Sequence, residues 1–330
     1  MKKFLNITYV LLGAMIILNS CHREDFPSHQ IPTESDCPIE FSPISASLET
    51  KTDASATIED FKVWASNKVN NVDNYNVFGS EGTDVRKSGS DWVYSPVRYW
   101  QPSNYNFYAV SPIEISSSIP ISGSLSSSGL SIYFGEKVDG SYSGWDLSSN
   151  QVDLLLASEQ NVTTRLNATN TPVDLAFDHL LSKITFTAKN VEEDNVSITV
   201  TGIEIRGCHT KSIGMTYNQE DTWTFPATTS GAHSLPAFSQ AITKTEYTDI
   251  GSSILVFPQE CKTLRVELTF NDTHNGVTTT GNVKSAIIQT NWDAGKQYNY
   301  KINVSFDSIS FGDITVDEWA DGQIINSEDF

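Results

Sequence analysis

The chain is poor in cysteine, histidine and basic residues. It has 4 Cys and 6 His among 330 residues, and no C-x-x-C pair, so it shows no zinc or iron–sulfur ligand pattern. Lys and Arg number 21 against 40 Asp and Glu, for a formal net charge of −19. Because that charge repels nucleic acid, we expect no nucleic-acid partner. Metalloprotease, nucleophile-elbow and phosphate-loop motifs are also absent from the sequence, so we expect neither an enzyme nor a bound cofactor.

The N-terminus has an apolar run that is too short to cross a bilayer. The run Val10–Leu18 follows Lys2 and Lys3, whereas a spanning helix needs about 20 apolar residues. A basic head, a short apolar core and small residues after it are typical of a secretory signal. The segment ends on Cys21 and so resembles a bacterial lipoprotein signal, which is cut before a cysteine that then carries lipid such as palmitate. The alternative is an ordinary secretory signal with a chance cysteine.

Composition along the chain predicts four segments. Residues 1–20 are the signal peptide, and the polar, proline-containing residues 21–37 are a lipidated tether. The remaining length suits about two domains. We place them at 38–168 and 169–330, because a polar stretch precedes residue 173, where alternating strands resume.

The hydrophobic pattern has a period of two residues. Apolar and polar side chains alternate over 184–188, 196–200, 264–270 and 302–306. Alternation predicts strands with one buried and one solvated face, as in antiparallel β-sandwiches. Helix is scarce: residues 58–64 form either one helical turn or the start of a strand. The Ser- and Gly-rich residues 114–131 read as a surface loop or an irregular edge hairpin.

The positions of the cysteines after the signal do not show whether the protein has a disulfide. Cys208 and Cys261 both lie in segments that look like strands, and the pair is open to two interpretations. They form a disulfide, or they are two small buried apolar residues.

Several aromatic blocks, taken in order, resemble the fimbrillin family of type V pilus lipoproteins. The blocks are Trp92–Trp100, Tyr105–Pro112, Asp153–Ala157, Val173–Ile184, Trp292–Tyr300 and Val316–Trp319. The resemblance implies an all-β protein with two transthyretin-like antiparallel β-sandwich domains in tandem. It also implies secretion as a lipoprotein to the cell outer membrane, exposed on the surface or built into a fimbrium.

The resemblance further implies assembly by strand exchange with other pilin subunits. The segment Ile39–Ile44 is a candidate plug strand that fills a groove in its own first sandwich. Lys51 is the first basic residue after it and the candidate processing site, although the family pattern favours Arg there. Ile314 and Val316 alternate with polar residues and mark a candidate donor strand. Either terminal segment has the alternative of being an ordinary strand of its own domain.

The sequence is also compatible with a second function, that of a surface binding protein. The chain would then be a surface lipoprotein that binds carbohydrate or host protein without polymerising. Such a protein would stack sugars on exposed rings, with Trp145 and Trp223 as candidates.

Overall fold

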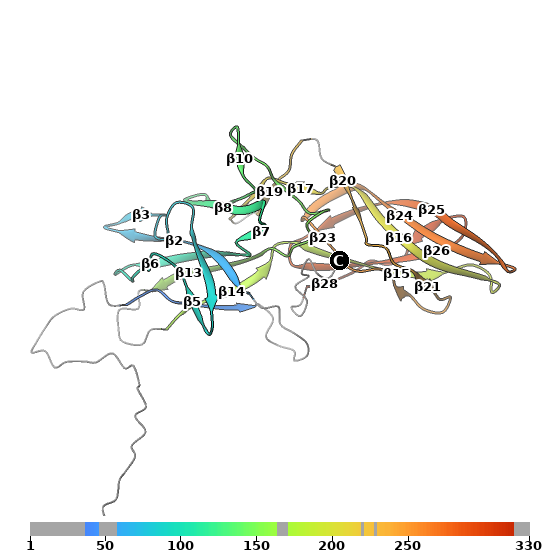
Figure 1. The fold of residues 1–330 in the computed structure, drawn as a ribbon, viewed down its shortest axis with the longest axis horizontal. Helices are drawn as coiled ribbons and strands as arrows, with labels where there is room; N and C mark the ends of the chain where they lie inside the picture. Colours follow the sequence, from blue (N-terminus) through green and yellow to red (C-terminus); the bar gives the residue numbers. More distant parts are fainter. Residues whose placement is uncertain (1–36, 46–57, 164–170, 219–220, 228–229, 320–330) are drawn as a thin grey trace, which may run out of the picture. The chain divides into compact units, whose positions relative to one another are not determined.

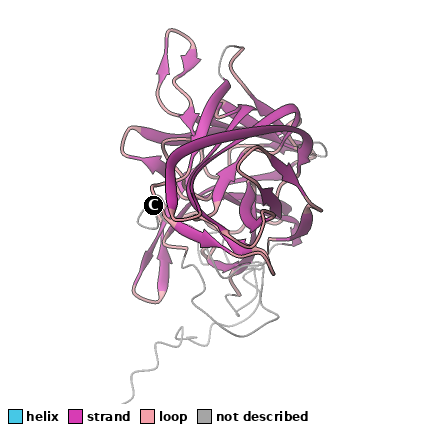
Figure 2. Ribbon diagram, turned by 90° about the vertical axis from the view of Figure 1, so that its right-hand side faces the viewer, coloured by secondary structure: helices cyan, strands magenta, loops and turns pink. Residues whose placement is uncertain are grey.

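A computed structural model describes residues 37–45, 58–163, 171–218, 221–227 and 230–319. Within these ranges the chain forms 28 strands and no helix, which confirms the all-β prediction (Figures 1 and 2). No helix in the described part of the chain is therefore long and apolar enough to cross a membrane.

The first sheet has eight strands and takes in the N-terminal segment. Its order is β1 (Phe41–Ser45), β14 (Val173–His179), β13 (Leu155–Thr163), β6 (Asn104–Ser111), β2 (Asp60–Val69), β4 (Thr83–Ser88) and β5 (Asp91–Val93), with β3 (Val72–Asn74) also paired to β2. Residues 58–64, which were open between helix and strand, enter β2 as a strand.

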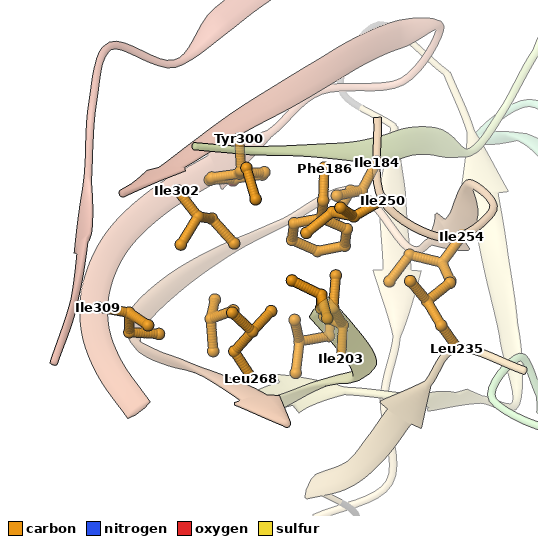
Figure 3. Packing of buried hydrophobic residues seen from close by; sticks show 14 of the residues in the cluster. Ile184, Phe186, Ile203, Leu235, Ile250, Ile254, Leu268, Tyr300, Ile302 and Ile309 are labelled. Atoms are coloured by element: carbon orange, nitrogen blue, oxygen red, sulfur yellow. The ribbon is translucent and has the colours of Figure 1, made fainter. Parts of the chain in front are cut away.

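The C-terminal part forms two sheets that face one core. One sheet runs β22 (Thr248–Asp249), β15 (Ser182–Asn190), β26 (Lys296–Val304) and β27 (Ile309–Phe311), with β23 (Ile254–Val256) on β15 and β28 (Thr315–Glu318) on β26. The other runs β20 (Ser230–Ser234), β16 (Val196–His209), β24 (Gln259–His274) and β25 (Val277–Trp292), with β21 (Gln240–Ile242) on β16. Isoleucine-rich faces of both sheets meet in the core drawn in Figure 3.

A five-stranded middle sheet joins segments that are far apart in sequence. Its order is β19 (Thr222–Thr224), β18 (Gly214–Tyr217), β9 (Gly129–Phe134), β8 (Ile119–Ser126) and β7 (Glu114–Ser116). Two short ribbons pair β10 (Lys137–Val138) with β11 (Ser141–Tyr142), and β12 (Trp145–Asp146) with β17 (Lys211–Ser212). Because Ile121, Leu125 and Leu130 are buried, the 114–131 segment is a core-forming hairpin rather than a surface loop.

The middle core draws side chains from the whole described chain. Trp64 and Leu156 of the first sheet pack in one cluster with Met215, Phe257 and Trp319. Sequence-distant segments thus bury a common apolar surface, which is the dominant source of folding free energy.

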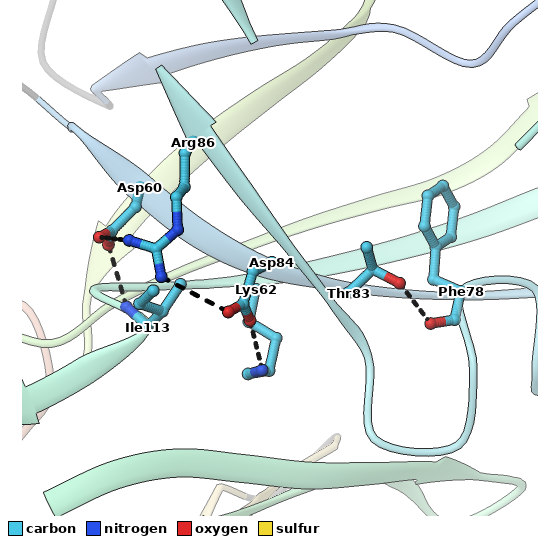
Figure 4. Close-up of polar contacts among 7 residues, drawn as sticks. All are labelled: Asp60, Lys62, Phe78, Thr83, Asp84, Arg86 and Ile113. Atoms are coloured by element: carbon cyan, nitrogen blue, oxygen red, sulfur yellow. Dashed lines mark hydrogen bonds and ion pairs between the residues drawn. The ribbon is translucent and has the colours of Figure 1, made fainter. Parts of the chain in front are cut away.

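Charged side chains pair across β2 and β4 (Figure 4). Lys62 Nζ lies 2.5 Å from Asp84 Oδ1, and Arg86 lies 3.7 Å from both Asp84 and Asp60. Asp60 also accepts a hydrogen bond from the Ile113 backbone N–H (3.0 Å). Exposed ion pairs add little stability, so we assign these contacts mainly to fixing the register of the two strands.

Most strand pairs are antiparallel, as expected, but two are parallel. β1 pairs parallel with β14, and β15 pairs parallel with β26 from Lys183↔Gln297 to Asn190↔Val304. The antiparallel prediction is wrong for these pairs. Alternation of apolar residues reports which face is buried and carries no information on the direction of the neighbouring strand.

The polar stretch around residue 168 lies between two paired strands. β13 before it and β14 after it are antiparallel neighbours, with Leu155↔His179 and Ala157↔Phe177 in register. The strands on either side of residue 168 therefore belong to one sheet. The division into two domains at residue 168 stays a prediction.

Cys208 and Cys261 are buried neighbours in the C-terminal core. Their side chains are 3% and 2% exposed, and both thiols are free. A hydrogen bond to Cys261, together with burial, raises the pKa of the Cys208 thiol. The structure favours the interpretation as buried apolar residues.

Gly123 lets the hairpin approach the Trp64 indole closely. A Cβ at Gly123 would lie 2.6 Å from Ser131 O and 2.9 Å from Cζ2 of Trp64. Because neither group has room to move in a packed core, Gly123→Ala should destabilise the protein by about 1–3 kcal/mol in urea unfolding. Gly202→Ala is the control, since its Cβ would meet Thr269 at an ordinary 3.4 Å. Equal effects of the two changes would contradict the packing argument.

Burial of His233 predicts that the protein loses stability in acid. It is 2% exposed on β20, and burial lowers its pKa from 6.5 to about 4. Between these two pH values His233 is protonated in the unfolded chain but neutral in the folded chain. The free energy of unfolding should therefore fall as the pH drops from 6.5 towards 4. The loss should reach about 3 kcal/mol at most. His233→Phe should flatten this part of the pH profile, measured by urea unfolding at pH 4 to 7. The exposed His274→Ala should leave it unchanged.

Candidate functional site

The N-terminal segment is hydrogen-bonded on one side to the chain before β6. The backbone N–H of Ile39 donates to Arg98 O (2.8 Å), and the N–H of Trp100 donates to Cys37 O (3.0 Å). Residues 37–39 therefore pair with residues 98–100.

The same segment then pairs with β14 on its other side. The N–H of Val173 donates to Glu40 O (2.7 Å), and the parallel register runs from Phe41↔Val173 to Ser45↔Phe177. The short N-terminal strand thus satisfies backbone groups of two separate segments of the first sheet.

Phe41 inserts into a pocket of aromatic rings. It is 4% exposed and meets Phe61 and Phe107 edge to face at centroid distances of 5.7 and 6.0 Å. Phe78 and Tyr94 lie tilted at 5.7 and 5.8 Å. Edge-to-face aromatic contacts add to the free energy of burial, so this ring is the main anchor of the segment.

Two further contacts hold this pocket in shape. The Tyr94 hydroxyl donates to Ile39 O (2.7 Å), and burial raises the pKa of Tyr94 to about 12, so the hydroxyl keeps its proton. The Thr83 hydroxyl donates to Phe78 O (2.6 Å), as Figure 4 shows. Sequence reasoning named the plug segment but missed Phe78 and Thr83, which no alternation or aromatic block marks.

Two of the predicted site residues lie outside the described residues. These are Cys21, the candidate lipidation site, and Lys51, the candidate processing site between β1 and β2 in sequence. Both stay predictions.

The candidate donor segment lies on the edge of the C-terminal sheet. β28 pairs antiparallel with the first half of β26, from Lys296↔Glu318 to Asn299↔Thr315. Ile314 is 37% exposed and Val316 is 51% exposed. Few side-chain contacts therefore hold this strand, and its assignment as a donor stays a prediction.

Trp319 fixes the end of that segment. Its side chain is 5% exposed, and its indole stacks on the imidazole of His179 at 3.8 Å. His179 Nδ1 lies 2.7 Å from Asp153 Oδ2, and Lys183 Nζ lies 5.7 Å from the indole centroid. The backbone N–H of Trp319 donates to Gly295 O (2.8 Å). The buried Trp319 side chain is therefore the main side-chain attachment of the C-terminal segment.

The two tryptophans proposed as sugar platforms are packed inside. Trp145 is fully buried, and its indole N–H donates to Asn150 O (2.9 Å). Trp223 is half-buried against Phe257, with a centroid distance of 4.8 Å. The middle core therefore takes up Trp145 completely and Trp223 in part. Within the described ranges no three His, Cys, Asp or Glu residues cluster to hold a metal ion.

Replacing Phe41 tests how firmly the groove holds its strand. Phe41→Ala should lower the free energy of unfolding by about 3–5 kcal/mol, since it empties the aromatic pocket. Ile44→Ala, at a half-buried position of the same strand, should cost clearly less. Urea unfolding gives both values, and hydrogen exchange at Val173 reports on the edge directly. Similar small losses for both variants would contradict the anchoring role.

Comparison with known proteins gives the fold and the family of the chain. A fimbrial protein from Bacteroides vulgatus ATCC 8482 has the same fold at TM-score 0.58 and 14% identity, covering 86% of this chain and all of that one. The tip fimbrial protein Mfa3 from Porphyromonas gingivalis, with a C-terminal truncation, matches at TM-score 0.43 and 11% identity, covering 86% and 98%. The search of curated protein sequences gave no match. The model of the fimbrillin-like family matches residues 49–319, and the chain therefore belongs to that family.

Proposed function

We propose that this protein is a structural or accessory subunit of a type V pilus that assembles by strand exchange and supports adhesion. The observation that carries the proposal is the N-terminal segment, whose backbone is paired on two sides and whose Phe41 fills an aromatic pocket. Family membership supports a role in fimbriae and adhesion, with other pilin subunits as partners.

Removing the segment would leave an energetically unfavourable edge. The backbone groups of 98–100 and of β14 would lose their partners, and four aromatic rings would face water. A strand from another subunit that pairs with both edges and fills the pocket would restore these interactions. The emptied groove therefore supplies both the driving force and the specificity for assembly.

Processing after Lys51 would release the plug. Lys51 lies between β1 and β2 in sequence, so a cut there would separate β1 from the first sheet without dividing any described strand. A subunit left uncut would keep its plug and its predicted lipid at Cys21. It would then act as an anchor or tip component at the outer membrane.

Ile314 and Val316 suit the role of donor side chains. Ile314 and Val316 are two residues apart, as Ile39 and Phe41 are. Ile314 and Val316 are exposed, whereas Ile39 and Phe41 are buried. In a strand, residues at this spacing point to the same face, so the pair matches the spacing of the pockets that Ile39 and Phe41 occupy. The tandem transthyretin-like sandwich domains divided at residue 168 remain part of this proposal.

A cleavage experiment tests the mechanism. Limited digestion with a Lys/Arg-specific protease should cut the wild-type chain after Lys51 and yield oligomers, seen by intact mass and light scattering. Lys51→Gln should stay uncut and monomeric. Val316→Asp should be cut but remain monomeric, because a carboxylate cannot enter the aromatic pocket.

A matched substitution serves as the control for Val316→Asp. Val277→Asp changes another exposed valine, at the start of β25 (70% exposed against 51% for Val316), and should assemble normally. Normal oligomers from Val316→Asp would overturn the donor assignment. Cut chains that retain the plug and never assemble would overturn strand exchange.

A further inference from the structure

A cleft of about 830 Å³ opens between the first sheet and the middle sheet. Strands β2, β6 and β13 contribute one wall, and the β8–β9 hairpin with β18 contributes the other. Its volume lies within the range of small-ligand sites. The side chains with most to offer a ligand are three tyrosines and three amides, Tyr75, Tyr108, Tyr217, Asn106, Gln160 and Asn218.

The tyrosines form a pre-arranged aromatic wall. Tyr108 and Tyr217 are half-buried and meet edge to face, with centroids 6.2 Å apart and an interplanar angle of 75°. The Tyr217 hydroxyl is hydrogen-bonded to Ser158, while burial raises its pKa. At neutral pH it is therefore a protonated hydroxyl that both donates and accepts hydrogen bonds.

The amides are held by neighbours at the cleft. Asn106 Oδ1 accepts a hydrogen bond from the Asn161 backbone N–H (2.9 Å), and Gln160 Nε2 donates to Ser158 Oγ (2.7 Å). Asn218 Nδ2 reaches across to Ser128 O at 3.4 Å. Asn106 and Gln160 each use one side-chain atom in these bonds and keep further donor and acceptor capacity for a ligand.

The lining suits one class of ligand. It contains no Asp, Glu, Lys, Arg or His among the described residues that form it. A phosphate or sulfate would find no cation in this lining, and the charges of Asp178 and Asp221, which reach Tyr217, would repel it. A lipid chain would leave the amides and serines desolvated without partners. An uncharged sugar has apolar C–H faces that cover tyrosine rings and hydroxyls that pair with amides and serines.

We propose that this cleft is a binding site for neutral glycans. Because the two rings are steeply inclined, one of Tyr108 and Tyr217 would cover a face of the sugar ring and the other would border it, while Asn106, Gln160 and Ser158 would bind its hydroxyls. None of Ile39, Phe41 or Val316 lines the cleft, so glycan binding neither requires nor reports on strand exchange. The two proposals can fail independently.

Saturation-transfer NMR and calorimetry with defined neutral sugars test the site. The probes are glucose, galactose, mannose, N-acetylglucosamine and their oligosaccharides, with heparin as a charged comparison. We expect saturation of sugar C–H protons by the wild-type chain for at least one neutral probe. Tyr108→Ala should weaken binding about tenfold. Tyr217→Phe removes only a hydroxyl, and Gln160→Ala removes the amide with one methylene; each should weaken binding about threefold to tenfold.

Two controls keep the outcome decisive. Tyr142→Ala alters a tyrosine of the β10–β11 ribbon, outside the cleft, and should bind as the wild type does. Thermal unfolding checks the fold of each variant, and Gln160 is exposed, so its variant tests the site even if Tyr108→Ala unfolds. The proposal fails if no neutral probe binds, if only heparin binds, or if Gln160→Ala and Tyr217→Phe both bind as well as the wild type.

Discussion

Burial of a common apolar core by distant segments is the constraint on which the rest of the structure depends. Trp64 of the first sheet and Phe257 from the C-terminal part lie in one cluster, together with the β8–β9 hairpin. Two consequences follow from this shared burial. Trp319 is held against His179 at the end of the described residues, and the first sheet lies opposite the hairpin. The attachment of the C-terminal segment and the tyrosine-lined cleft both rest on that packing.

The two ends of the described chain are held in different ways. The N-terminal segment has a paired backbone and two buried side chains, Ile39 and Phe41, with Phe41 among four rings. The C-terminal strand β28 has paired backbone but exposed side chains, and Trp319 alone is buried beyond it. A buried strand is costly to remove and leaves a selective groove, whereas an exposed strand is easy to detach. This asymmetry is what the proposed plug and donor roles would require, although Trp319 would also have to leave His179.

Adhesion needs a surface that recognises something, and the cleft offers a chemical basis for it. The chain carries a net charge of −19, which discourages contact with anionic surfaces. Recognition of a neutral sugar through tyrosine faces and amides does not depend on long-range charge. A negative surface and an uncharged binding site are therefore compatible in one adhesive subunit.

The sequence by itself determined the all-β class, the strands of the C-terminal sandwich and the family. Alternation over 184–188 and 264–270 places one face of each strand in the core, because successive side chains point to opposite sides. The resemblance to the family, together with apolar alternation, also singled out Ile39–Ile44 as a candidate plug strand. Phe306 shows the limit of the pattern: it continues the alternation but lies beyond β26 and is 48% exposed.

Only the tertiary structure decided which segments meet. The parallel pairing of β1 with β14, the buried state of Trp145 and the facing tyrosines at 108 and 217 join residues that are far apart in the chain. Local periodicity reports whether a face is buried, but not which surface buries it or in which direction the neighbouring strand runs. Those choices are set by the packing of whole sheets, so the aromatic pocket and the cleft emerge only from the folded chain.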